Sequence, residues 1–291
     1  MTWFYLILGS GILISITNIL EKKILVKEHA LEYSGVISIL NTLFSLPLLF
    51  FVNYSTLHFL PILYLFFITM TSALAFVLIA KSTRHMEVSS VSPMLNMSTG
   101  VTALLSFLIL GEVLTRFQVL GIIMLIVGSY VLQTHHEESI FDPIKRFVNS
   151  KYLHFILIAI VCYGIDSIYD RFALTHYQID PLGYLVIAHL FISFHLIMAM
   201  NTFYNGWSGI KKGMQNMHWW VIGISIITVI QRVMHIFATS MAYVGLVVAV
   251  KRSSSLFTVL LAGELFHEKN IIRKLLASAI LIAGVVLIVI K

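Results

Sequence analysis

The sequence predicts an all-α integral membrane protein in which ten transmembrane helices form two inverted five-helix repeats. Of the 291 residues, 59% are hydrophobic and only 11% are charged, and the mean hydropathy is +0.94. A soluble domain of this length cannot bury that much apolar surface, so the surrounding solvent must be lipid. Apolar runs long enough to cross a bilayer recur along the whole chain, and the second half repeats the pattern of the first.

Each predicted helix is an apolar run close to the roughly 20 residues that a transmembrane helix needs. In chain order the ten runs are 2–20, 33–53, 58–80, 88–110, 117–134, 152–173, 182–203, 218–240, 243–263 and 271–290. The first has no basic stretch before it and no small-residue cleavage pattern, so we expect a retained helix and not a signal peptide. The eighth opens with Trp219 and Trp220, which are typical interfacial anchors.

The connections between these runs are mostly short. The longest, residues 135–151, is polar, carries Pro143 and forms the natural boundary between the two halves. We therefore predict a first repeat at 1–134, a connecting loop at 135–151 and a second repeat at 152–291.

Two pairs of segments carry the repeat. Residues 92–112 and 244–264 are apolar, equally long and end in Gly-Glu, and each precedes one further apolar helix. Residues 15–25 (SITNILEKKIL) match 164–174 (GIDSIYDRFAL). Two copies with an odd number of helices must insert in opposite orientations, as in secondary transporters built from inverted repeats. We expect the two closing glutamates to fix the turns into the next helices.

Charge and motif content exclude several classes of function. The net charge of +6 and the pI near 9.3 reflect basic cytoplasmic loops in a membrane protein, so no nucleic-acid partner is expected. The lone Cys162 excludes an internal disulfide. No phosphate-binding glycine loop, His-Glu metal pair or nucleophile motif occurs. We therefore expect no ATP-driven step, no enzyme activity, no cofactor and no metal site.

Several of these features occur together in one family. They are SITNILEKKIL at 15–25, Pro93 with Gly111-Glu112, Gly121 and Gly128, AVKRSSSLFTVLLAGELFHEKN at 249–270, and Ala277 with Gly284. On these residues, and over nearly its whole length, the chain resembles the EamA family of the drug/metabolite transporter superfamily. The resemblance implies two inverted five-helix repeats around a central cavity, which is lined mainly by helices 1, 3, 4, 6, 8 and 9. It places helices 5 and 10 at the periphery or at a homodimer contact.

The resemblance and the charge pattern disagree on orientation. Basic residues concentrate in the loops after odd-numbered helices, so the positive-inside rule places both termini outside the cytoplasm. The resemblance implies both termini in the cytoplasm, and the orientation stays open.

Polar and ionisable side chains inside a predicted span are costly, and they therefore indicate function. In the sixth helix they recur at i, i+3, i+4 and i+7, which puts them on one face, and the eighth and ninth helices carry polar faces with adjoining arginines. The first repeat adds amides, which need hydrogen-bond partners in lipid. The candidate substrate-binding residues are Asn18, Asn96, Tyr163, Asp166, Asp170, Gln231, Arg232, His235, Lys251 and Arg252.

In this set cations outnumber carboxylates near mid-helix, which predicts a net-positive cavity for an anionic or zwitterionic group. A structural alternative is that Asp166 or Asp170 pairs with Arg232 or Lys251 and only holds the helices together. His235 suits proton coupling, or else a packing role.

All the ionisable residues of this set lie in the second repeat. In the first repeat, Glu21 stands at the end of the first helix and is not expected to be buried among them. The membrane histidines of the seventh helix, His189 and His195, have weaker claims, because that helix is expected to be peripheral.

These expectations combine into a secondary transporter of a multi-pass cell membrane, a bacterial inner membrane in particular. It would export a small polar metabolite, an amino acid or related carboxylate, by alternating access. One alternative is translocation of an amphipathic substrate such as a lipid-linked sugar or a hydrophobic drug. Another is a membrane scaffold without transport, which the buried charges argue against.

Overall fold

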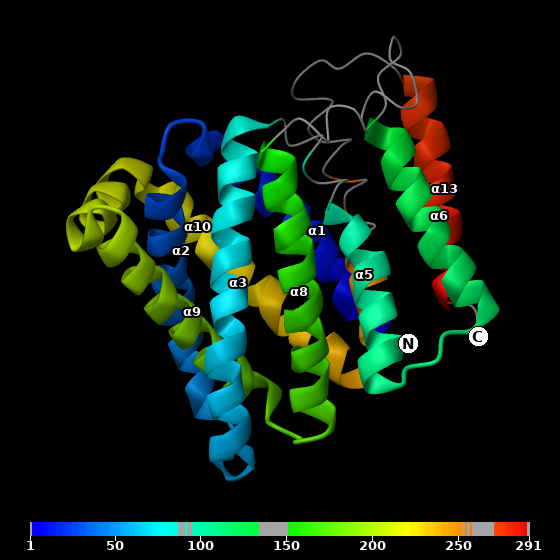
Figure 1. Ribbon diagram of the computed structural model, residues 1–291, viewed down its shortest axis with the longest axis horizontal. Helices are drawn as coiled ribbons and strands as arrows, with labels where there is room; N and C mark the ends of the chain where they lie inside the picture. Colours follow the sequence, from blue (N-terminus) through cyan, green and yellow to red (C-terminus); the bar gives the residue numbers. More distant parts are fainter. Residues whose placement is uncertain are drawn as a thin grey trace.

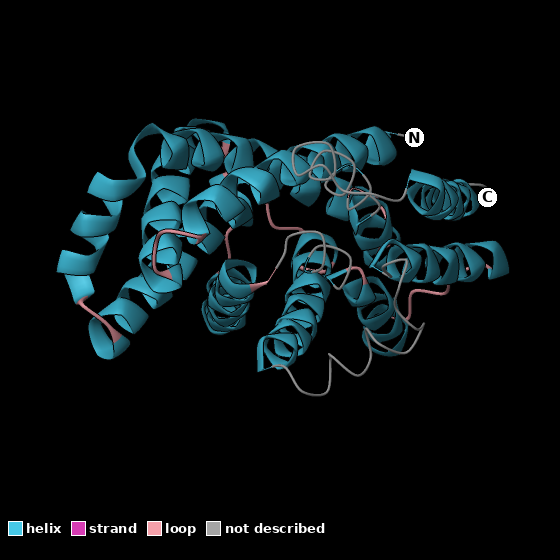
Figure 2. Cartoon of the chain, turned by 90° about the horizontal axis from the view of Figure 1, so that it is seen from above, coloured by secondary structure: helices cyan, strands magenta, loops and turns pink. Residues whose placement is uncertain are grey.

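In the computed structural model the described residues are 2–86, 91, 95–133, 151–252, 254, 257 and 271–289, and they form helices without strands (Figures 1 and 2). The α-helices are α1 (Thr2–Leu25), α2 (Ala30–Ser45), α3 (Phe59–His85), α5 (Met97–Leu105), α6 (Arg116–Gln133), α8 (Lys151–Thr175), α9 (Pro181–Phe203), α10 (Gly206–Met241), α11 (Val244–Arg252) and α13 (Ile271–Val289). Three short elements accompany them: the 3-10 turns η1 (Leu46–Phe51) and η2 (Tyr54–Thr56), and the π-helical η3 (Ser106–Leu110).

Each of the ten predicted segments overlaps one of these α-helices. Six spans are long and apolar enough to cross a membrane: Thr2–Leu25, Ala30–Phe51, Phe59–His85, Lys151–Thr175, Pro181–Phe203 and Trp219–Met241. Shorter apolar helices cover Met97–Leu110, Arg116–Gly128 and Ala279–Ile288. The chain is therefore an all-helical, multi-pass membrane protein. The described residues do not include Pro93 or Glu264. They also leave out most of the part of the predicted segment 243–263 that follows Arg252.

Proline and capping residues set several helix ends. Pro47 has no N–H to continue the α-helical ladder, and α2 passes there into the 3-10 turn η1. The Asp180 side chain accepts a hydrogen bond from Gly183 N at 2.9 Å and Pro181 occupies the first turn, so α9 begins with two standard N-terminal signals. Gly111 ends η3 with φ of 68°, a conformation that glycine adopts at little cost.

The helix α10 is much longer than the segment predicted at 218–240. Its 36 residues extend about 54 Å at 1.5 Å per residue, against a hydrocarbon core of about 30 Å. The apolar span begins at Trp219, as predicted, and Trp219 and Trp220 are exposed. The preceding turns, with the exposed Lys211 and Lys212, therefore belong outside the hydrocarbon.

Helices of one half pack against helices of the other. The first helix of each half contacts the third helix of the opposite half, as α1 against α10 and α8 against α3. The remaining helices contact their own counterparts. α5 packs on α11, α2 packs on α9 and α6 packs on α13, and the last two pairs can be followed in Figure 1. The last pair comes closest, because a Cβ built on Gly121 would lie 2.6 Å from the Gly284 carbonyl oxygen. Small residues permit this approach of two backbones in a membrane.

Two cations at matching positions tie helices together within each half. When 15–25 is laid over 164–174, Lys22 coincides with Arg171. The Lys22 Nζ donates to the carbonyl oxygens of Thr83 and Met86, both at 2.6 Å, at the end of α3. Arg171 Nη1 donates to the carbonyl oxygens of Thr239 at 2.7 Å and Ser240 at 3.0 Å, at the end of α10. Each half thus fastens its first helix to the last turn of its third.

Glu112 follows η3 and connects the halves at that end of α10. Its Oε1 forms an ion pair with Arg171 Nε at 3.1 Å, and its Oε2 accepts from Val244 N at 3.0 Å. Burial raises the pKa of the Glu112 carboxyl, and the Arg171 charge opposes that rise. The expected structural role of this glutamate therefore agrees with its contacts.

Candidate functional site

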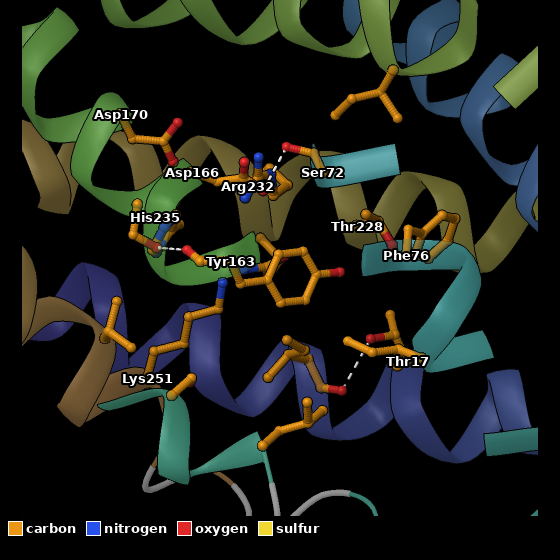
Figure 3. Close-up of a pocket in the computed structure, with 18 of the residues that line it drawn as sticks. Thr17, Ser72, Phe76, Tyr163, Asp166, Asp170, Thr228, Arg232, His235 and Lys251 are labelled. Atoms are coloured by element: carbon orange, nitrogen blue, oxygen red, sulfur yellow. Dashed lines mark hydrogen bonds between the residues drawn. The ribbon is translucent and has the colours of Figure 1, made fainter. Parts of the chain in front are cut away.

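Side chains from both halves surround a cavity of about 220 Å³ (Figure 3). They come from α1, α2, α3, α5, α8, α9, α10 and α11. Pockets between helices are where helical proteins bind small ligands, and this volume suits a small metabolite and not a macromolecule.

The structure brings nine of the ten predicted site residues to this one cavity. They are Asn18, Tyr163, Asp166, Asp170, Gln231, Arg232, His235, Lys251 and Arg252. Asn96 is the exception: it is buried just before α5 and does not line the cavity. Ser98 and Thr102, four residues apart on one face of α5, line it instead. That these side chains bind a substrate stays a prediction.

The cations of the cavity come from neighbouring helices. Arg232 lies on α10, while Lys251 and Arg252 end α11. Figure 3 shows Lys251 extending from α11 toward the middle of the pocket, where Tyr163 also lies. Arg252 Nε donates to Ser98 Oγ at 3.1 Å, which leaves the rest of its guanidinium without a protein acceptor in the described chain.

Direct ion pairs between these cations and carboxylates, the structural alternative raised by the sequence, are absent from the described residues. Neither Asp166 nor Asp170 forms an ion pair with Arg232 or Lys251, and the ion pair that the described residues do contain is the one between Glu112 and Arg171. The structural alternative, in which buried charges hold the helices together, therefore lacks direct ion pairs among the described residues, although Asp170 lies within electrostatic range of Arg232 and Lys251.

The two carboxylates of α8 are held by hydroxyl groups instead. Asp166 Oδ1 accepts from Thr71 Oγ1 of α3 at 2.5 Å. Its Oδ2 accepts from Ser72 Oγ, also on α3, at 2.7 Å (Figure 3). Asp170 Oδ1 accepts from Tyr184 OH, on α9, at 2.6 Å. These neutral donors satisfy the carboxylates without removing their charge from the cavity.

Two further polar residues of α10 differ in how they are held. Gln231 Nε2 donates to Ser10 Oγ of α1 at 2.8 Å, across the contact between the halves. His235 is 3% exposed, and its Nδ1 has no hydrogen-bond partner among the described residues. Its ring therefore has a free position next to Lys251 in the cavity lining.

Helices 2 and 7 contribute more than the sequence led us to expect. Ser38 and Asn41 of α2 and His189 and Ile192 of α9 line the cavity. The expectation that the seventh helix is peripheral is therefore wrong. The sequence does show polar side chains inside these apolar helices. It does not show which way those side chains point.

Glu21 is a second correction. It lines the cavity from α1, so the charge around the cavity is not confined to the second repeat. The match between 15–25 and 164–174 places Glu21 over Asp170, and that alignment was the signal that could have identified it.

Comparisons with known proteins agree with this architecture. A family model described as the EamA-like transporter family matches residues 1–134. Among 27 matching chains of solved structures, one titled only "Crystal structure of protein" aligns with a TM-score of 0.67 and 13% identity, over 97% of this chain and 96% of its own. At that identity the likeness shows the fold alone, and curated proteins give no match. Through residues 1–134 the predicted resemblance is confirmed: this first half of the chain matches the EamA-like transporter family, which is part of the drug/metabolite transporter superfamily.

Proposed function

We propose that this protein is a secondary transporter that exports a small polar metabolite, an amino acid or related carboxylate. The two five-helix halves, 1–134 and 152–291, would be inverted repeats that rock around the cavity by alternating access. The membrane would be a bacterial inner membrane.

One observation carries the substrate class. Arg232 and Lys251 face a cavity of about 220 Å³, and neither forms a direct ion pair with a carboxylate within the described residues. An unpaired cation inside a membrane protein is costly, and an anionic group on a ligand compensates that cost. A carboxylate is the natural complement, because it accepts several charge-assisted hydrogen bonds at once.

Six of the lining residues have a role in this proposal. Lys251 and Arg252 would engage the anionic group, with Arg232 beside them. Asn18 and Gln231 would supply hydrogen bonds to polar parts of the substrate. The free ring position of His235 would suit a coupled proton.

The pattern of helix contacts supports alternating access. The exchange of partners, α1 with α10 and α8 with α3, is the arrangement expected when a two-fold axis relates the halves. The cavity lies where these four helices meet, since Asn18, Phe76, Asp166 and Thr228, one from each, all line it. A site shared in this way is reached from opposite sides when the halves tilt.

A transport assay in vesicles tests the proposal. Lys251→Ala should lower uptake of a labelled amino acid or carboxylate at least about tenfold, because one charge-assisted contact is lost. Lys212→Ala, at an exposed position of α10, is the matched control and should leave uptake unchanged. Equal uptake by the two variants, at equal protein levels, would contradict the cationic site.

A binding screen separates the alternatives. Thermal shifts of the purified protein should appear with small carboxylates or amino acids. Shifts confined to lipid-linked sugars or hydrophobic drugs would favour an amphipathic substrate. No shift with any compound, together with no uptake, would favour a scaffold.

A further inference from the structure

We infer that Asn41 and His189 form a second subsite of the cavity, on the side covered by α2 and α9, which binds an uncharged hydrogen-bonding group of the substrate. A hydroxyl or a carboxamide is such a group. The inference rests on the proposed function, because it adds a neutral contact to the anion-binding one. It narrows the transported metabolite to a carboxylate or amino acid that also carries one of these groups.

Within the described chain, the cavity-lining side chains that keep a buried atom without a hydrogen-bond partner fall on two sides. His235 and Thr102 stand on α10 and α5, and both helices contact α11, which carries Lys251. Asn41 Oδ1 and His189 Nδ1 stand on α2 and α9, and neither of these helices carries a lysine or an arginine. The first pair belongs with the cations of the proposed anion site, whereas the second pair is a separate group.

Asn41 and His189 stand on helices that touch one another at this level. The Thr42 hydroxyl, next to Asn41 in the chain, donates to the His189 carbonyl oxygen at 2.9 Å. Both residues lie near the middle of their apolar spans, Ala30–Phe51 and Pro181–Phe203, and therefore at the depth of the hydrocarbon core. An unpaired polar atom is costly there, and a ligand group that pairs with it removes that cost.

The repeat shows that the two halves build this side of the cavity from matching positions. Counted from the N-caps of α2 and α9, Ser38 coincides with His189, and Asn41 coincides with Ile192. All four line the cavity. Ser38 Oγ already donates to the Gly35 carbonyl oxygen at 2.9 Å, and Ile192 is apolar. The two groups without a partner therefore come one from each half, and a ligand that contacts both bridges the halves.

The chemistry of the pair favours a neutral group. The amide of Asn41 has an oxygen that accepts and an NH₂ that donates, and Nδ1 of His189 does either, according to its tautomer. A hydroxyl or a carboxamide also donates and accepts, so it complements the pair. Arg232 lies within electrostatic reach of His189, which disfavours a cationic group at this place.

The subsite is separated from the cations of α11. Figure 3 shows Lys251 and His235 at one side of the pocket and Phe76 at the opposite side. Phe76 packs against the core cluster that contains Leu40 of α2 and Leu196 of α9. The lining from α2 and α9 is therefore on the Phe76 side, and a substrate with an anionic group at one end and a neutral polar group at the other would span the cavity.

Matched ligand pairs test the subsite on the purified full-length protein. The two members of a pair have the same shape, but a methyl replaces the hydroxyl or an isopropyl replaces the carboxamide. Suitable pairs are homoserine with norvaline, asparagine with leucine, and 4-hydroxybutanoate with pentanoate. In the wild type, the polar member of at least one pair should bind about tenfold or more tightly than its apolar partner, because the apolar group leaves the buried atoms unpaired.

Variants then assign that preference to the two residues. Asn41→Leu and His189→Leu should each reduce it to below about threefold. The apolar member should bind to these variants at least as tightly as to the wild type, which also shows that they fold. Ser34→Ala is the matched control: it removes another buried hydroxyl of α2 that lacks a partner in the described chain, but Ser34 does not line the cavity. This control should keep the wild-type preference.

The outcomes separate this inference from the proposed function. Wild-type protein that binds both members of every pair equally overturns the α2–α9 subsite and leaves the anion site standing. A preference that persists in both leucine variants also overturns the subsite. Lys251→Ala should weaken both members of a pair by the same factor, and a preference lost in that variant would place the polar group at the cations instead. Wild-type protein that binds no member of any pair overturns both proposals.

Discussion

Glu112, from the first half of the chain, forms an ion pair at 3.1 Å with Arg171, from the second half. The same carboxylate accepts a hydrogen bond from the first backbone N–H of α11, and Arg171 also holds the last carbonyls of α10. Glu112 is 6% and Arg171 15% exposed, so this contact lies largely away from water. Three helices of the second half are thus fixed to the first half at one point.

Glu112→Ala should destabilise the protein by about 1–3 kcal/mol, because Arg171 loses its counter-ion and α11 loses its cap. Glu112→Gln should cost less, since the amide oxygen still accepts from Val244 N. The apparent melting temperature in detergent measures both effects. Lys212→Ala is the exposed control, and an equal loss of stability in that variant would argue against a specific role for Glu112.

Gly284→Leu should separate α6 from α13. A Cβ at Gly284 would already lie 2.8 Å from the Gly121 carbonyl oxygen, so a larger side chain must push the backbones apart, at a cost of about 1–3 kcal/mol. Gly223→Leu is the matched control, because a Cβ at Gly223 meets nothing within 4 Å. Thermal stability of the two variants makes the comparison. Similar stabilities would mean that the close approach of the two helices contributes little.

His29 should make the start of α2 sensitive to pH. Its Nδ1 accepts a hydrogen bond from Leu31 N at 3.3 Å, which needs the neutral ring. Burial, aided by the Arg84 charge, lowers the pKa of His29 below 6.5, while Glu32 opposes the shift. Its stabilising contribution, about 1 kcal/mol for such a cap, is therefore fully present above pH 6.5 and is lost as the pH falls through the lowered pKa.

A pH series of melting temperatures checks this sign. Between pH 8 and pH 5 the wild type should lose more stability than His29→Asn, whose amide caps the helix without titrating. Parallel curves for the two proteins would show that His29 does not carry the dependence.

The helices could be predicted from the length and apolar character of the segments. The face that each helix turns toward the cavity could not. Ten apolar runs have the length of a span, and the helical spacing of Tyr163, Asp166 and Asp170 correctly predicted a shared face turned to the cavity. Asn41 and His189 have no such pattern, because an apolar helix has no solvated face to reveal its direction. Which side they present depends on contacts between the halves, such as α2 with α9, and these are tertiary.

The partners of the two buried carboxylates of α8 could not be predicted from the sequence either. Opposite charges on neighbouring helices suggested an ion pair between Asp166 or Asp170 and Arg232 or Lys251. Local spacing could not reveal that hydroxyls of Thr71, Ser72 and Tyr184 take those carboxylates instead. Thr71 and Ser72 stand on α3, in the other half of the chain, and Tyr184 stands on α9, the next helix after α8.

The two cation-to-carbonyl ties described for Lys22 and Arg171 have a mechanical consequence. α1 is joined to α3 by Lys22, α3 packs on α8, α8 is joined to α10 by Arg171, and α10 packs on α1. If the two halves rock as proposed, these contacts would make the four helices tilt together and not one at a time. Opening of the ring at one end would then be coupled to closing at the other.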